Sequence, residues 1–371
     1  RVQLVYEKLF PNGLPYTVIT VAGTNGKGST VSFIDSIYRQ STYKVGRSTS
    51  PHLLKYNERY AIDGEDVSDE VIINAFELIE TKREDIKLTY FEFSTLAAFI
   101  IFEKAEVDIA ILEVGLGGRL DSVNVVDSDV SIITNIAIDH TDYLGDTREA
   151  IGREKAGVMR GSRPCICGDQ DPPQSLLAYA KEIGTDITFV RKAYEDDIGL
   201  EGDHQRLNAA VAIQAVESLK EQHPISFSMI IEGVKSATIK ARFEKIEIGE
   251  KTIILDVAHN PAAVKTLVDT LSKSSMQTVA IFSALIDKDI IEMVDLASNA
   301  IKHWYLVPLT AERAIESDAL KNKFSNPDST TICKDMNSAI QESLAYKEAE
   351  RIVIFGSFYT IADASIIINE L

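Results

Sequence analysis

Short runs of apolar, mostly β-branched residues alternate along the chain with longer segments of helical spacing. In the first half, strands are expected at residues 16–21, 107–113 and 130–136, and helices at 29–43, 92–104 and 149–158. Strands that alternate with helices of about 10–15 residues are typical of a mostly parallel sheet with helices on both faces. The pattern therefore predicts an α/β domain.

The same alternation begins again near residue 251. Strands are expected at 251–256, 278–282, 304–307 and 351–355, and helices at 262–273, 289–300 and 337–346. This second series is long enough to close its own sheet. A charged stretch with Gly249 separates the two series, so we place the boundary there, between a domain of residues 1–246 and a smaller Rossmann-like α/β domain of residues 247–371. The acidic residues 192–202 are expected to form a loop.

Composition excludes several classes of protein. Hydrophobic residues make up 45% and charged residues 25% of the 371, which excludes a disordered chain. With 38 basic and 56 acidic residues the net charge is −18, so we expect no nucleic-acid or membrane-surface partner. The longest apolar runs are much shorter than the roughly 20 residues of a membrane span. Three cysteines, with no secretory segment in view, indicate a cytoplasmic protein. The sequence begins with Arg1 and not Met, so we expect the natural chain to begin earlier.

The strongest local signal is a glycine-rich loop between a predicted strand and a predicted helix. Residues 21–30 read VAGTNGKGST. Glycines allow backbone N–H groups to face an anion, and the start of the helix adds positive potential. Lys27 can reach the β- and γ-phosphates of ATP, and the hydroxyl of Ser29 or Thr30 can bind Mg²⁺. The alternative is a glycine-rich turn with an incidental lysine, but the strand and helix flank the loop as nucleotide binding requires.

Polar side chains follow other predicted strands. Glu113 ends the run 107–112 and precedes a glycine-rich segment, and His140 lies between Asp139 and Asp142 after another strand. Ligands of open parallel sheets gather at the carboxyl ends of strands, so both are candidate metal or phosphate ligands. The alternative is a solvated charge at a strand end or a structural histidine.

Four further residues are of interest because of their place along the chain. Lys155 lies in a helical run and, from its surroundings alone, is a solvated helix lysine. Asp256 and His259 end the first strand of the second series, in the position that the glycine-rich loop occupies in the first. Arg242 lies just before the predicted boundary, where it is either a surface charge or a cation for nucleotide phosphates.

Ordered motifs along nearly the whole chain resemble the folylpolyglutamate synthase family, which is related to the Mur peptidoglycan ligases. The motifs lie at residues 22–29, 49–53, 57–59, 112–119, 139–141, 152–157, 204–210, 256–261 and 355–358. The resemblance implies a P-loop domain like the central domain of Mur ligases and a C-terminal glutamate-ligase domain. It also implies an ATP- and Mg²⁺-dependent ligase that adds L-glutamate to dihydropteroate or reduced folate through an acyl phosphate.

The resemblance assigns roles to individual residues. ATP contacts are implied for Asn25, Gly26, Lys27, Gly28, Ser29, Thr30, Asn208, Arg242, Asp256 and His259. Ligands of two Mg²⁺ ions are implied at Ser29, Ser50, Glu113 and His140. The resemblance implies catalytic roles for Lys27, His140 and Lys155. Lys155 matches a lysine that is carbamylated in the family, and this role replaces its interpretation as a solvated helix lysine. Pterin contacts are implied at Thr89, Tyr90, Phe91, Glu92, Arg119, Leu120 and Asp121.

Some expectations differ between members of the family. Relatives often have glycine before the arginine at position 242, where this chain has Ala241. Members are mostly monomers, so we expect a monomer.

The alternatives to a folylpolyglutamate synthase activity are a Mur-type ligase with a nucleotide-sugar peptide as acceptor, a P-loop kinase or phosphohydrolase that needs no glutamate, and a non-catalytic ATP-binding protein.

Overall fold

The computed structural model of the chain describes residues 1–311 and 313–370. It consists of two compact units. The first contains Arg1–Gly199 and Gln205–Thr238, and the second contains Leu200–His204 and the chain from Ile239 onward.

The first unit is built on an eight-stranded sheet with the order β4-β3-β2-β5-β1-β6-β7-β8. The strands are β1 (Thr17–Ala22), β2 (Val45–Ser48), β3 (Tyr60–Ile62), β4 (Glu65–Asp66), β5 (Ile109–Glu113), β6 (Val130–Ile133), β7 (Pro164–Cys167) and β8 (Asp186–Phe189). The pairings from β2 to β8 are parallel, and β3 and β4 form an antiparallel edge.

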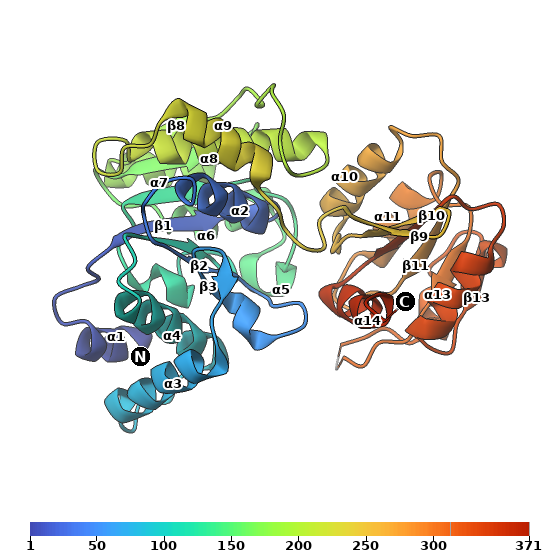
Figure 1. The fold of residues 1–371 in the computed structure, drawn as a ribbon, viewed down its shortest axis with the longest axis horizontal. Coiled ribbons are helices and arrows are strands. Elements are labelled where there is room, and N and C mark those ends of the chain that lie inside the picture. Colours follow the sequence, from blue (N-terminus) through green and yellow to red (C-terminus); the bar gives the residue numbers. More distant parts are fainter. Residues whose placement is uncertain (312, 371) are drawn as a thin grey trace. The chain divides into compact units, whose positions relative to one another are not determined.

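Helices cover both faces of this sheet (Figure 1). They are α1 (Val2–Leu9), α2 (Lys27–Tyr38), α3 (Asp69–Arg83), α4 (Tyr90–Lys104), α5 (Thr141–Leu144), α6 (Arg148–Ala156), α7 (Gln174–Ile183), α8 (Asp203–Ser218) and α9 (Phe227–Ser236), with short 3₁₀ turns at Tyr56–Arg59 and Ser122–Val125. In Figure 1, α2, α8 and α9 lie on one side of the strands, and α1, α3 and α4 lie on the other.

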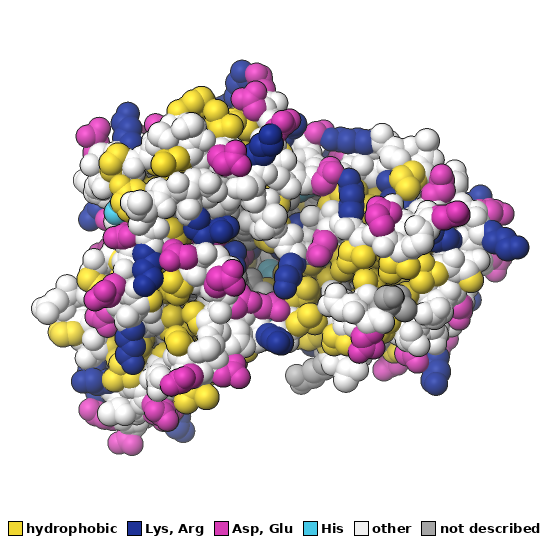
Figure 2. All heavy atoms as spheres, viewed as in Figure 1, with side chains coloured by type: hydrophobic (Ala, Val, Ile, Leu, Met, Phe, Trp, Pro, Cys, Tyr) yellow, Lys and Arg dark blue, Asp and Glu magenta, His cyan; other side chains and the backbone are white. Residues whose placement is uncertain are grey.

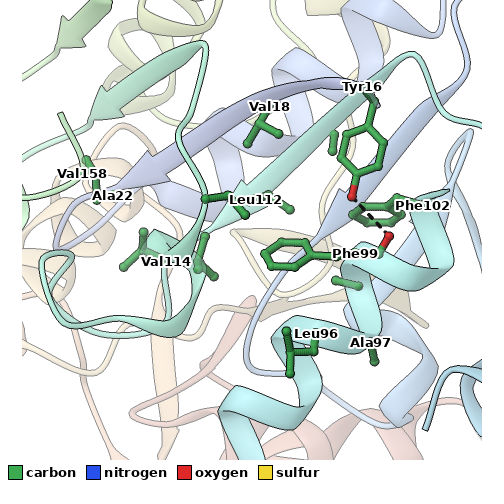
Figure 3. Close-up of a cluster of buried hydrophobic side chains, with 14 of the residues drawn as sticks. Tyr16, Val18, Ala22, Leu96, Ala97, Phe99, Phe102, Leu112, Val114 and Val158 are labelled. Carbon is green, nitrogen blue, oxygen red and sulfur yellow. Dashed lines mark hydrogen bonds between the residues drawn. The ribbon is translucent and has the colours of Figure 1, made fainter. Parts of the chain in front are cut away.

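Large apolar side chains fix α4 against the sheet. Figure 3 shows Leu96, Phe99 and Phe102 of α4 facing Val18 of β1 and Leu112 of β5, and all five side chains are less than 4% exposed. Tyr16 belongs to this cluster and donates its hydroxyl hydrogen to the backbone oxygen of Phe99 at 3.2 Å. Burial of each such side chain stabilises the fold by about 1.5–3 kcal/mol. The core thereby holds β1 and β5 rigidly, and both strands end at the candidate site.

The second unit is a six-stranded sheet with the order β13-β12-β11-β14-β10-β9, in which only β9 is antiparallel to its neighbour among the described pairs. The strands are β9 (Glu244–Ile248), β10 (Lys251–Leu255), β11 (Thr278–Phe282), β12 (Trp304–Leu306), β13 (Thr330–Ile332) and β14 (Arg351–Phe355). The helices are α10 (Pro261–Leu271), α11 (Ile290–Ala297), α12 (Ser317–Lys321), α13 (Met336–Ala345) and α14 (Phe358–Ile368), with a 3₁₀ turn at Pro327–Ser329. Trp304 is 2% exposed and packs against Phe282, Phe324 and Phe355.

The predicted α/β class with two parallel-rich sheets is confirmed, and residues 192–202 lie outside helices and strands as expected. The structure divides the chain differently from the predicted 246/247 boundary, which falls inside β9. The charged stretch 245–250 is part of an antiparallel hairpin between β9 and β10, and its alternating charged residues form the exposed face of an edge strand. The compact units instead divide at Thr238 and Ile239.

Charged side chains of both signs lie on the surface. On the face shown in Figure 2, acidic and basic side chains are interspersed. Within residues 1–311 and 313–370, none of the helices has the length and apolar character that crossing a bilayer requires.

Candidate active site

Four neighbouring parallel strands of the first unit bring the predicted site residues to one edge of the sheet. The sheet order places β2, β5, β1 and β6 side by side, and the register aligns Val21 with Glu113 and Ala22 with Ile133. Ser50 follows β2, Glu113 is the last residue of β5, the glycine-rich loop follows β1, and His140 lies in the segment after β6. Carboxyl ends of parallel strands meet at the same edge, which is where open α/β sheets bind ligands.

The loop after β1 leads into a helix whose first turn has no side-chain cap. Gly26 is the N-cap of α2 with φ 82°, and as a glycine it has no side-chain oxygen to cap the helix. By contrast, Ser68, Thr89 and Thr147 cap α3, α4 and α6 with their side-chain oxygens. The first N–H groups of a helix need an acceptor, and together with the helix dipole they favour an anion. The start of α2 is therefore suited to a phosphate group.

Two glycines of the loop occupy positions that no larger residue fits. Gly23 has φ 147°, and a Cβ there would lie 1.8 Å from Oγ1 of Thr134. A Cβ on Gly26 would lie 2.7 Å from Oδ1 of Asn208. Asn208, a predicted ATP contact on α8, thus lies directly against the loop.

Two lysines, Lys27 and Lys155, lie near the loop, and Lys155 is buried. Lys27 donates from Nζ to the backbone oxygens of Gly23 and Thr24, each at 3.1 Å. Lys155 is only 3% exposed, and burial, followed by the nearby charge of Lys27, lowers its pKa to about 7. The predicted solvated lysine is wrong for Lys155, because α6 packs this face into the unit. A neutral amine is accessible at Lys155 near pH 7, which suits the carbamylation implied by the family.

Among the candidate metal ligands, Ser50 and Glu113 are joined by a hydrogen bond. Glu113 is 7% exposed, and its Oε2 accepts a hydrogen bond from the backbone N of Ser50 at 3.1 Å. The imidazole Nε2 of His140 lies 3.9 Å from Oδ2 of Asp139, on a residue with φ 52°. Ser29 is 1% exposed, and the buried hydroxyl of Thr30 has no hydrogen-bond partner among the described residues.

These groups fit a magnesium ion that also binds phosphate oxygens. Within residues 1–311 and 313–370, no group of three or more His, Cys, Asp and Glu side chains is arranged to hold a metal by itself. Mg²⁺ is usually held by one or two carboxylates together with substrate phosphates and water, so one carboxylate and serine hydroxyls beside a phosphate loop suit it.

The predicted pterin contacts divide into exposed and structural residues. Tyr90 is 61% exposed and Leu120 is 78% exposed, so both are accessible to a ligand. Thr89 and Glu92 form the capping box of α4, and Phe91 packs against Gly115. Arg119 pairs with Glu154 at 2.8 Å. Asp121 accepts from the backbone N of Leu116 and of Val123, each at 2.9 Å, and burial raises its pKa to about 6.

In the second unit, Asp256 organises the segment before β9. Its two oxygens accept from the backbone N of Phe243 and of Ala258, each at 2.8 Å. Burial raises the pKa of this carboxyl group, and the charge of Arg242 opposes that rise. The guanidinium of Arg242 lies 5.5 Å from the ring centroid of Phe358, which is also 6.1 Å from the ring of His259. Arg242, Asp256 and His259 are therefore brought together within this unit.

Some neighbours of these residues had no role assigned from sequence. Phe358 begins α14 and contacts both Arg242 and His259. Desolvation, followed by the nearby charge of Arg242, lowers the pKa of His204 to about 4. Thr134 and Asn135 bind the backbone of the glycine-rich loop. They directly follow β6, which ends at Ile133, whereas the strand was predicted to continue to residue 136, so the prediction placed them inside the strand. The change from apolar to polar residues at Thr134 is the signal that could have identified them.

Family models and known proteins match the chain along its length. Residues 21–181 match the Mur ligase middle domain, and residues 241–358 match the glutamate ligase domain of Mur ligases. The dihydrofolate synthase/folylpolyglutamate synthase of Escherichia coli K12 is 35% identical, over 100% of this chain and 90% of that protein.

Solved structures of such proteins are similar throughout. E. coli FolC in complex with DHPP and ADP superposes with a TM-score of 0.93 at 34% identity, over 100% of this chain and 92% of that one. A bifunctional folylpolyglutamate synthase/dihydrofolate synthase with Mn, AMPPNP and L-glutamate bound gives a TM-score of 0.91 at 37% identity, over 100% and 93%. The chain therefore belongs to the dihydrofolate synthase/folylpolyglutamate synthase family of Mur-type ligases, and it is an ATP-dependent ligase.

Proposed function

We propose that the protein joins L-glutamate to the carboxylate of dihydropteroate and of reduced folates, with ATP as the source of free energy. The observation that carries this proposal is the row of strand ends β2, β5, β1 and β6, with a glycine loop, an uncapped helix start and a carboxylate at one edge. The ADP, DHPP and glutamate bound in the similar structures support it.

The reaction has two steps. The substrate carboxylate attacks the γ-phosphorus of ATP, which forms an acyl phosphate and releases ADP. The amine of glutamate then attacks the acyl carbon, forms the amide bond, expels phosphate and loses its proton to solvent. Lys27 and the N-terminus of α2 hold the triphosphate and neutralise charge that develops on it.

Ser29, Ser50, Glu113 and His140 would hold the divalent cation at the same edge, with the carboxylate of Glu113 as the anionic ligand. When bound, Mg²⁺ supplies Lewis-acid neutralisation of phosphate charge. The lowered pKa of Lys155 supports its modification: its neutral amine attacks CO₂, and the resulting carbamic acid loses a proton to give the carbamate. The product is an anion, which suits a site that gathers cations.

The remaining assignments are parts of the same proposal. Asn25, Gly28, Thr30 and Asn208 of the first unit contact ATP, and the resemblance to the family also assigns ATP contacts to Arg242, Asp256 and His259. Tyr90 and Leu120 are the pterin contacts that their exposure favours most. The protein acts as a monomer in the cytosol. Light scattering during size-exclusion chromatography tests the oligomeric state, and a stable dimer would contradict it.

Phosphate release tests the function. With ATP, Mg²⁺, dihydropteroate and glutamate, phosphate should appear only when both acceptor and amino acid are present, and tetrahydrofolate in place of dihydropteroate tests the second activity. Lys27→Ala should lower the rate by at least about 100-fold, because a preorganised cation at the phosphates is lost. ATP turnover without glutamate would indicate a kinase or phosphohydrolase, and full activity of Lys27→Ala would refute the site.

The acyl phosphate has its own test. When the acceptor carboxylate carries ¹⁸O, attack on the γ-phosphorus and later expulsion of phosphate place one ¹⁸O atom in the released phosphate. Mass spectrometry of that phosphate detects the transfer. Unlabelled phosphate together with amide formation would exclude the acyl-phosphate route.

A further inference from the structure

An ion pair holds both backbone polar groups of Ile136, in the segment after β6. Oδ2 of Asp169 accepts from the backbone N of Ile136 at 2.6 Å, and Nε of Arg148 donates to the backbone O of Ile136 at 3.0 Å. Nη2 of Arg148 donates to Oδ1 of Asp169 at 3.0 Å, which closes the arrangement. Arg148 and Asp169, named here the clamp, therefore hold Ile136 through two hydrogen bonds and are joined to each other by a third.

The residues on either side of Ile136 hold the glycine-rich loop. Oγ1 of Thr134 donates to the backbone O of Asn25 at 2.7 Å, and Oδ1 of Asn135 accepts from the backbone N of Asn25 at 2.9 Å. The backbone N of Ala137 donates to Oγ1 of Thr24 at 3.0 Å. Residues 134–137, named here the bracket, thus face the loop at 134, 135 and 137 and face the clamp at 136.

The clamp belongs to the folded framework of the first unit. Asp169 follows β7, is 5% exposed, and its Oδ1 also accepts from the backbone N of Asp171 at 2.9 Å. Arg148 is the first residue of α6, the helix that carries Lys155. Hydrogen bonds to charged partners are stronger than neutral ones, and a buried aspartate that loses its partner is costly. The bracket is therefore anchored to two elements that do not belong to the loop.

We propose that Arg148 and Asp169 are positioning residues of the phosphate-binding loop, which act through the bracket and need no contact with the nucleotide. This inference rests on the proposed function, because it assigns the loop to ATP. Without the clamp, the bracket loses the support that fixes the backbone of Thr24 and Asn25. The loop then samples conformations that do not fit the phosphates, so nucleotide binding weakens more than the chemical step slows.

The opposite end of β6 offers a matched control. Oδ2 of Asp129 accepts from the backbone N of Val18 at 2.9 Å, and its Oδ1 lies 2.6 Å from Nη1 of Arg163. This pair also joins an arginine, an aspartate and a backbone N–H group. It lies at the start of β6, away from the loop, so its loss costs stability without disturbing the bracket.

The test compares Asp169→Asn and Arg148→Lys with Asp129→Asn and Arg163→Lys. Calorimetric titration with AMPPNP and Mg²⁺ gives the Kd, steady-state assays give the KM for ATP and kcat, and thermal unfolding gives Tm. We expect Asp169→Asn to raise both Kd and KM about tenfold with kcat at saturating ATP changed by less than about threefold, the signature of lost uniform binding. Arg148→Lys changes them in the same direction by less, and the control variants lower Tm with Kd within about twofold of wild type.

Several results would overturn the inference. Wild-type Kd in both Asp169→Asn and Arg148→Lys, with Tm lowered as in the controls, would leave the clamp a purely structural role. An equal loss of affinity in Asp129→Asn would show that any damage to β6 weakens nucleotide binding. If Asp169→Asn does not fold, Arg148→Lys decides. Failure of wild type to bind AMPPNP would overturn the proposed function together with the clamp, whereas equal binding by wild type and both variants would overturn the clamp alone.

Discussion

The loop after β1 in the first unit and the segment before β9 in the second both contain backbone with positive φ, but with different residues. The loop uses Gly23 and Gly26, at φ 147° and 82°. The segment uses Ala241 and Phe243, at φ 58° and 53°. Such values are unfavourable for residues with a Cβ.

The surroundings explain the difference. In the first unit, Thr134 and Asn208 occupy the space where a Cβ would lie, so only glycine fits. In the second unit, carboxylates hold the strained backbone: Glu244 accepts from the backbone N of Ala241 at 2.7 Å, and Asp256 accepts from that of Phe243 at 2.8 Å. Hydrogen bonds can therefore stabilise an unfavourable conformation, but they cannot relieve a steric overlap. Glycine is required where a loop must lie close to other groups.

The largest expected effect comes from Gly23→Ala. The new Cβ would overlap Oγ1 of Thr134 at 1.8 Å in a conformation suited to glycine, so we expect a destabilisation of about 3 kcal/mol or more. Displacement of the loop should lower kcat/KM for ATP by at least about 100-fold. Thermal unfolding and phosphate release measure the two effects.

Gly249→Ala is the control in the second unit. Gly249 has φ 62° in the β9–β10 turn, and nothing lies within 4 Å of the added Cβ. The backbone cost alone should be about 1 kcal/mol, with activity unchanged. If the two alanine variants lost equal stability and activity, crowding at Gly23 would not explain its glycine.

An intermediate effect is expected from Lys155, which is buried near the glycine-rich loop. The pKa of Lys155 is lowered from 10.5 to about 7, so between these pH values the unfolded chain binds one proton more than the folded protein. The free energy of unfolding should therefore rise with pH across that window, by on the order of 3–5 kcal/mol in total. Lys155→Met should remove this part of the rise. Chemical denaturation at several pH values, in buffers free of CO₂, measures it.

The same variant separates the two roles of the lysine. Depletion of CO₂ should lower the activity of wild type, and bicarbonate should restore it, because only the neutral amine forms a carbamate. Lys155→Met should be inactive in both buffers. Parallel pH profiles of stability in the two proteins would show that Lys155 is charged in the folded state.

The smallest effect is expected for Ala241→Gly. Glycine relieves the positive φ, by about 1–2 kcal/mol, but it also frees the unfolded backbone and removes a buried methyl group. These contributions nearly cancel, so we expect a change below about 1 kcal/mol. The fluorescence of Trp304, the one tryptophan of the sequence, reports unfolding of the second unit. A stabilisation above 2 kcal/mol would mean that the carboxylates do not support this backbone.

The sequence predicted the central strands and the loop because these elements carry strong local signals. β1, β5 and β6 consist mainly of apolar and β-branched residues, and 22–29 combines glycines and a lysine between a strand and a helix. β2, β3, β7 and β8 were not predicted. They have only three or four residues each, so their length does not distinguish them from loop segments.

Pairings between distant segments could not be predicted. Asp169 follows the unrecognised strand β7, and its partner Arg148 precedes it by 21 positions, so no spacing rule connects them with Ile136. The burial of Lys155 likewise depends on packing of α6 and not on its helical pattern. The structural roles of Thr89 and Glu92 follow from the capping box of α4, which the resemblance to a pterin site had obscured.

The central claim is that the uncapped start of α2 binds the triphosphate. A crystal structure of the protein with AMPPNP and Mn²⁺ tests it most directly. We predict that the β- and γ-phosphates lie against the backbone N–H groups of residues 26–29, with the metal ion beside Ser29 and Glu113. Phosphates bound elsewhere, with the first turn of α2 facing only solvent, would contradict the account.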